Sequence, residues 1–395
     1  MICLETQHFN INRMLLLIVG LWPYQRSFLI ELQLILFFGI LITFIVFQLT
    51  TFITSECTLG IINKVLSSSF FFICLLIEYN SFWINTDILK IALKQLQEVC
   101  NEIKNKNEIA IIKKYGSQAK CITIGLILLV ICFQFIFILL YIWPYIRHIM
   151  ILNNSQSHSP PHIITEYFID QEKYSYLITV HRHAACLIGS LAMLATGTML
   201  ITYVQHICAM FSIACNNVID SYRIKLAIDI SHENNSKNDQ KSYKDIIHAI
   251  NIHRNAIKLL NILVSNFQGS YIFLIAAGTI SASCNLFRFM SFISIEQLIL
   301  SLLFLSILYV YSFISNYMAQ QITDHHEYIF ITVYTVRWYM APIHIQKMVL
   351  FLLQRGIKSL HVTLGGIFVG SIQSFASLTS TSISYFTVLY STMHD

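Results

Sequence analysis

Seven uncharged or nearly uncharged stretches alternate with polar, charged segments along the chain. They cover residues 32–54, 65–83, 121–143, 185–207, 262–287, 297–319 and 359–394. An α-helix of about 20 apolar residues is long enough to cross the hydrocarbon core of a membrane. The second stretch contains Glu78 near its end, and the others are essentially free of charge. The pattern predicts an all-α membrane protein with seven transmembrane helices.

The last stretch is unusually polar for a membrane span. Its 36 residues contain no Asp, Glu, Lys or Arg, yet 17 of them are Gly, Ser, Thr or Gln. Polar side chains inside a span tend to face protein or a water-filled cavity rather than lipid. A continuous helix of this length would measure about 54 Å. We therefore expect Gly365, Gly366 and Gly370 to break the helix or to pack it closely.

Several positions of this last stretch share one helical face at steps of four and three. They are Ser377, Thr381, Ser384, Val388 and either Ser391 or Thr392. One interpretation is the wall of a hydrated pore, in which Val388 forms an apolar constriction that gates by dewetting. The other is that Ser and Thr simply allow helices to pack closely. The pattern alone leaves both interpretations open.

The distribution of Lys and Arg predicts the orientation in the membrane. Twenty of them fall in the N-terminal segment and in the connections after the second, fourth and sixth stretches, and five fall on the other side. Because cytosolic segments are enriched in Lys and Arg, the N-terminus is expected in the cytosol and the C-terminus outside. Asn153 begins a glycosylation sequon in an outer loop, which agrees with this orientation.

The connections on the cytosolic side contain apolar residues at helical spacing. Examples are the series Leu89, Leu93 and Leu96 after the second stretch, and the series Ile246, Ile250, His253, Ile257 and Leu260 before the fifth. The pattern predicts an intracellular helical domain with its own core. The alternative is a set of peripheral helices on the lipid surface.

Composition indicates a polytopic membrane protein, and the sequence shows no enzyme fingerprint. Only 11% of residues are charged, against about 25% in an average soluble domain. The sequence contains no hydrolase, kinase, P-loop or dinucleotide fingerprint, so we expect no enzyme activity, no cofactor and no nucleic-acid partner. The ten Cys residues are scattered and no CxxC pair occurs, so no metal site is expected. A bridge between Cys57 and Cys284 is conceivable, although unpaired cysteines are the default expectation.

The last third of the chain carries a specific set of residues. They are Tyr334, Trp338, Tyr339, Pro342, Gln346, Lys347, Arg355, Lys358, Gly365, Gly366, Phe375 and the terminal run Ser384, Tyr385, Phe386, Thr387, Val388 and Leu389. In these residues the chain resembles the insect odorant receptor family. The length of the chain and its seven spans of inverted topology also fit that family.

The resemblance implies a channel subunit. Members of the family are tuning subunits that assemble with a shared co-receptor, Orco, into tetrameric cation channels opened by small volatile odorants. The implied layout is transmembrane helices in residues 1–319, an intracellular anchor in 320–358 and a pore-lining helix in 359–395. By motif position Val388 matches the main gate residue, and Thr392 matches a second gate position that is Leu in the co-receptor. The implied location is the plasma membrane of sensory neurons, among membrane lipids and without a required G protein.

The resemblance also implies where odorants bind, namely between the second, third, fourth and sixth spans in the outer half of the bundle. The candidate pocket residues there are Phe71, Phe72, Phe137, Tyr141, Met193, Thr196 and Phe304. An apolar cavity with one or two hydroxyl groups suits a small volatile ligand. Taken singly, each aromatic residue also fits core packing or lipid contact.

Three other classes of membrane protein fit the sequence less well than an odorant receptor. A G-protein-coupled receptor would have the opposite charge bias and an Asn-Pro dipeptide in its last span, and this chain has neither feature. A transporter is not supported by an internal repeat or by paired intramembrane charges. A gustatory-receptor-like homotetrameric ligand-gated cation channel is the closest alternative.

Overall fold

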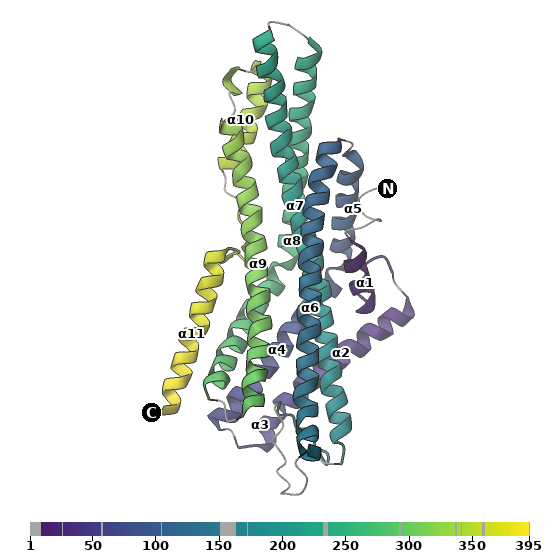
Figure 1. Ribbon diagram of the computed structural model, residues 1–395, viewed down its shortest axis with the longest axis vertical. Helices are drawn as coiled ribbons and strands as arrows, with labels where there is room; N and C mark the ends of the chain where they lie inside the picture. The colour runs from purple at the N-terminus through teal and green to yellow at the C-terminus, as the bar shows by residue number, and fades with distance from the viewer. Residues whose placement is uncertain are drawn as a thin grey trace.

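The computed structural model describes residues 9–25, 27–56, 58–103, 105–150, 163–171, 173–231, 236–291, 294–335, 338–340, 342–357 and 360–394. Asn153 and Cys57 lie outside the described residues. Cys284 is buried and unpaired. The described part is almost entirely helical (Figure 1).

The helices that precede the long bundle segments are α1 (Asn10–Ile18), α2 (Phe28–Leu49), α3 (Thr51–Thr54), α4 (Leu59–Ile84) and α5 (Thr86–Glu102). The long segments are α6 (Lys106–Met150), α7 (Ser175–Ser231), α8 (Ser236–Met290) and α9 (Ile295–Thr335). The chain ends in the 3-10 helix η1 (Trp338–Met340), α10 (Ile343–Ile357), the strands β1 (Thr363–Leu364) and β2 (Phe368–Val369), and α11 (Ile372–His394).

Six of the predicted spans are confirmed as helices long and apolar enough to cross a membrane. They lie in residues Phe28–Thr54, Leu59–Ile84, Lys106–Ile142, Ser175–Ile219, Tyr243–Met290 and Ile295–Thr335. The seventh predicted span is also a helix, α11, but it is not among these six. The chain is thus an all-α membrane protein of the predicted class, and its last helix is the polar exception.

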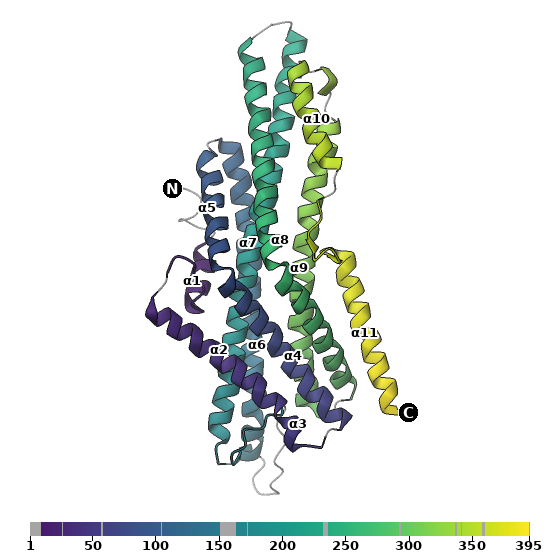
Figure 2. The same cartoon turned by 180° about the vertical axis from the view of Figure 1, so that it is seen from behind.

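Helices α4, α6, α7, α8 and α9 form the bundle, and α7 and α8 pack along each other over much of their length (Figure 1). Helices α7 and α8, together with α9 and α10, extend well beyond the ends of α4 and α6 (Figure 1). Figure 2 shows α2 crossing the bundle obliquely on the side away from α11. Helix α11 lies at the edge of the molecule and packs mainly against α8 and α9.

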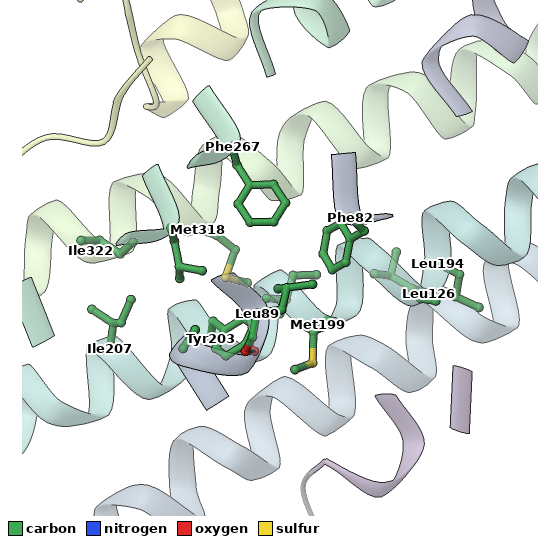
Figure 3. Close-up of a cluster of buried hydrophobic side chains, with 14 of the residues drawn as sticks. Phe82, Leu89, Leu126, Leu194, Met199, Tyr203, Ile207, Phe267, Met318 and Ile322 are labelled. Carbon is green, nitrogen blue, oxygen red and sulfur yellow. Dashed lines mark hydrogen bonds between the residues drawn. The ribbon is translucent and has the colours of Figure 1, made fainter. Parts of the chain in front are cut away.

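The projecting ends and α5 share a packed core with the bundle. Leu89, Leu93 and Leu96 of α5 are almost fully buried, as are Ile246 of α8 and Ile345 of α10. In Figure 3 the side chains of Leu89 of α5 and Tyr203 of α7 lie side by side, and the Tyr203 hydroxyl donates to the Leu89 carbonyl at 3.3 Å. These helices therefore form a packed helical extension rather than separate peripheral segments.

The tail is divided by a hairpin. Thr363 pairs with Val369 and Leu364 with Phe368, and the turn between them places Gly365 at φ 59° and Gly366 at φ 70°. Glycine adopts this left-handed conformation without the steric cost that other residues have. Helix α11 begins directly afterwards because the Ser371 hydroxyl accepts from the Ser374 N–H at 3.1 Å, an N-cap. The expectation that glycines interrupt the last stretch is met here.

Candidate ligand sites and pore helix

The seven residues predicted to bind odorant are all buried. Their relative exposures range from 0% for Phe72, Phe137, Thr196 and Phe304 to 9% for Tyr141. Phe71 stacks on Phe304 with 4.3 Å between ring centroids and meets Phe72 edge-on at 5.7 Å. The predicted residues from α4 and α9 therefore lie together in one aromatic cluster.

A residue that the sequence interpretation missed joins the two halves of this cluster. Phe133 of α6 lies 6.5 Å from Phe71 and 5.9 Å from Phe137, and Phe137 in turn lies 5.2 Å from Tyr141. The three α6 aromatics follow at steps of four residues and so share a helix face. That spacing was the signal available in the sequence.

The two residues of the predicted set with hydroxyl groups, Thr196 and Tyr141, already interact with other groups of the protein. The Thr196 hydroxyl donates to the Ala192 carbonyl at 2.9 Å within its own helix, which leaves only its acceptor capacity for a ligand. The Arg182 guanidinium carbon lies 4.6 Å from the centroid of the Tyr141 ring, a cation–π contact in the buried interior. A ligand in this region would therefore meet mainly aromatic surface.

An apolar cavity lies elsewhere in the bundle. It has a volume of about 270 Å³ and is lined by α4, α7, α8 and α9, by the hairpin and by the first half of α11, with Leu126 of α6 at one side. Phe267, Met318 and Ile322 of its wall are labelled in Figure 3. Met193 is the one predicted pocket residue that lines this cavity. The aromatic cluster and the cavity are thus neighbouring but different regions.

The predicted pore stripe lies on the outward face of α11. Ser377, Ser384 and Thr392 are exposed and Thr381 is half-buried, while Val388 is 59% exposed. The hydroxyls of Thr381 and Ser384 donate to the carbonyls of Ser377 and Ser380, so their own helix satisfies them. An exposed face of this kind fits both a wet pore wall and a contact between subunits.

The opposite face of α11 attaches the helix to the bundle. Ser382 is 3% exposed, and the Phe375 ring meets Phe313 of α9 edge-on with 5.4 Å between centroids. The Asn316 side-chain oxygen accepts from the Ser371 N–H at 3.3 Å, which ties the start of α11 to α9. The helix therefore uses its inward face for its own chain and leaves the stripe uncovered.

Several histidines of the bundle take part in hydrogen bonds and ring contacts. His181 bonds to Tyr167 at 2.8 Å and to Thr43 at 3.1 Å, and His325 bonds to Tyr115 at 2.7 Å. His326 stacks on His253 at 5.4 Å between ring centroids. Within the described ranges, no three His, Cys, Asp or Glu side chains are grouped so that they could hold a metal ion.

These features define a multi-pass membrane protein with a buried aromatic cluster and an apolar cavity. A family model described as the 7tm odorant receptor matches residues 58–383, and the chain belongs to this family. A search of curated proteins finds no match. Among solved structures, the chain is similar to the insect olfactory receptor OR5 from Machilis hrabei in complex with eugenol, with a TM-score of 0.78. The identity is 15%, and the match covers 97% of each chain.

A second structure of the insect olfactory receptor OR5 from Machilis hrabei gives the same result. Its TM-score is 0.76 at 15% identity, with 96% of this chain and 97% of that chain covered. At 15% identity, the similarity to these structures supports a shared fold. The predicted class of odorant receptor is confirmed by the family match and by the shared architecture.

Proposed function

We propose that this chain is a tuning subunit of an odorant-gated, non-selective cation channel that forms a heterotetramer with the co-receptor Orco. Odorant binding at the aromatic cluster favours a state in which the α11 helices of the tetramer separate and let cations pass. The proposed site of action is the plasma membrane of sensory neurons.

The observation that carries this proposal is the uncovered stripe of α11. A helix whose inward face holds it to α8 and α9, and whose outward face is lined with hydroxyl groups, is suited to a central pore between subunits. Val388 is the proposed gate because it places an apolar side chain on that polar face. Thr392 is the proposed second, more polar position one turn further along.

The odorant site is proposed at the cluster of Phe71, Phe72, Phe137, Tyr141, Met193, Thr196 and Phe304. Its aromatic surfaces suit a small volatile molecule, since apolar pockets with few polar groups bind such ligands. Phe133 joins the proposed site because it contacts both Phe71 and Phe137.

Recording odorant-evoked currents in oocytes tests the proposal. The chain is expressed in two conditions, once alone and once together with Orco. Orco expressed alone is the control. We expect a panel of volatile odorants to evoke current only when both chains are present. Odorant-evoked current from this chain alone, without gain from Orco, would instead support the homotetrameric gustatory-receptor-like channel.

A further inference from the structure

The cavity of about 270 Å³ lies between the aromatic cluster and the pore helix. Its wall includes Gly278 of α8, Asn316 of α9 and Ser382 of α11. Six of the seven predicted odorant-binding residues do not line it. Its size is near the lower end of the roughly 300–1,000 Å³ typical of ligand pockets. The space therefore suits a small molecule that is separate from an odorant in the cluster.

The wall of the cavity is apolar except for a few groups that converge on it. Among the described residues, Oε2 of Glu78 and the Tyr311 hydroxyl are both buried and have no hydrogen-bond partner. The Glu78 carboxyl is close enough to Tyr271 and Tyr311 to interact with them electrostatically. All three residues line the cavity. A carboxyl group inside a span without a donor is costly, which indicates a partner that the chain itself does not supply.

The cavity is also connected to the start of the pore helix. Asn316 lines the cavity, and its side-chain oxygen accepts a hydrogen bond from the Ser371 N–H. Leu378, Thr379 and Ser382 of α11 form another part of the wall. An occupant therefore contacts both α9 and α11, and it shifts the pore equilibrium to the extent that it binds the two states unequally.

We propose that this cavity is a second ligand site, which binds a small apolar molecule with one hydroxyl group and thereby modulates the channel. The hydroxyl donates a hydrogen bond to Glu78, and the apolar body fills the space between α7, α8 and α9. The inference goes beyond odorant binding at the aromatic cluster.

The probes are three alcohols or phenols, each paired with its methyl ether: thymol, geraniol and 1-octanol. The ethers keep the apolar body and lose the donor. Purified full-length protein in detergent gives the first readout, a thermal shift, which requires no channel activity. Odorant-free current of the channel formed with Orco gives the second readout and rests on the proposed function. Orco alone is the control for the current.

We expect at least one alcohol to raise the melting temperature and to change the odorant-free current at least twofold, at concentrations tenfold lower than its ether needs. Glu78→Gln keeps an acceptor and should retain the preference for the alcohol. Glu78→Leu should remove that preference.

A matched pair of glycine variants tests the location. A Cβ on Gly278, which lines the cavity, would meet nothing within 4 Å, so Gly278→Leu is expected to place its side chain in the space. Gly269, also on α8, has the same open surroundings but does not line the cavity, so Gly269→Leu is the control. Gly278→Leu should weaken the alcohol effect at least tenfold, and Gly269→Leu should leave it within threefold.

Three results would overturn the proposal. They are equal potency of every alcohol and its ether, an alcohol effect that survives Gly278→Leu at unchanged potency, and absence of a thermal shift with all three alcohols. If the thermal shift appears as expected but no current is seen, the site stands and the channel function fails.

Discussion

The Arg182 guanidinium lies over the face of the Tyr141 ring, with 4.6 Å between the guanidinium carbon and the ring centroid. Both side chains are at most 9% exposed. A cation held against an aromatic face and away from water gains about 2 kcal/mol. The contact joins α6 to α7 at the edge of the aromatic cluster and fixes the position of a residue predicted to contact odorant.

Replacing the ring of Tyr141 tests this contact. Tyr141→Leu should lower the stability of the protein by about 1–3 kcal/mol, because the Arg182 cation loses its aromatic partner. Tyr141→Phe keeps the ring face and is the matched control, which should retain most of the stability. Thermal melting of the purified protein measures the difference. Equal melting temperatures for the Leu and Phe variants would show that the contact contributes little.

Conservative substitutions in the aromatic cluster test the proposed odorant site. Because Phe72 and Phe304 are fully buried, truncation to Ala would cost about 3–5 kcal/mol and confuse folding with binding. Phe72→Leu, Phe304→Leu and Met193→Leu change shape with less loss of volume. We expect the half-maximal odorant concentration to change about tenfold in at least one of them, with surface expression within twofold of the parent.

The control for that series is Phe82→Leu. Phe82 is also buried and packs against Phe267 at 5.2 Å, but it lies outside the cluster. Its response should match the parent. If all three cluster variants respond as the parent does, odorants bind elsewhere.

The gate assignment predicts a gain of open channels from a polar residue at Val388. Val388→Ser makes the proposed constriction wettable, so odorant-free current should rise severalfold relative to surface expression. Ile383→Ser is the control, since Ile383 is exposed on α11 but points away from the stripe. Currents of the parent and of both variants are recorded in the presence of Orco and compared. Unchanged basal current and conductance in Val388→Ser would remove Val388 as a gate.

A pair formed by a buried carboxylate and a partly exposed histidine in the helical extension predicts pH dependence. Glu108 of α6 accepts from Asn217 of α7 at 2.7 Å and lies 3.2 Å from His248 of α8, outside the predicted spans at 121–143 and 262–287. The hydrogen bond that His248 donates to the Glu108 carboxylate raises the pKa of His248 above its ordinary value of about 6.5. A raised pKa in the folded state means that the stabilisation is complete below about pH 6.5 and is lost as pH rises through the folded pKa.

The melting temperature should therefore fall by roughly 1–3 °C between pH 6 and pH 9 because of this pair. His248→Gln should flatten that part of the profile. Melting curves of the purified parent and variant across this range give the comparison. Parallel curves for the two proteins would show that the pair does not contribute.

The sequence predicted the six apolar helices because a membrane span needs a long uncharged stretch, and that requirement is local in the chain. The pocket residues expected from the family resemblance are buried, although each aromatic residue taken singly also fitted lipid contact. The sequence did not predict the cavity, whose wall combines α4, α7, α8, α9 and α11. Glu78 stood out as a charge within a span, but its neighbours Tyr271 and Tyr311 are about 190 to 230 residues away in the sequence. Such pairings depend on how the helices pack.

The exact start of the last helix also depended on local geometry. The uncharged stretch begins at residue 359, whereas α11 begins at Ile372. The difference arises from the Gly365–Gly366 turn and from the Ser371 cap, which the absence of charge does not distinguish from helix.

The continuity of α9 has a mechanical consequence. The helix runs for 41 residues from Ile295 to Thr335 without interruption, a rod of about 60 Å. It passes the aromatic cluster at Phe304, the cavity and α11 at Asn316, and the packed extension at Ile329. A tilt of about 5° at one end of such a rod displaces the other end by about 5 Å. Helix α9 is therefore built as a lever arm that can convert a small displacement around a bound molecule into a large one at the far end of the helix.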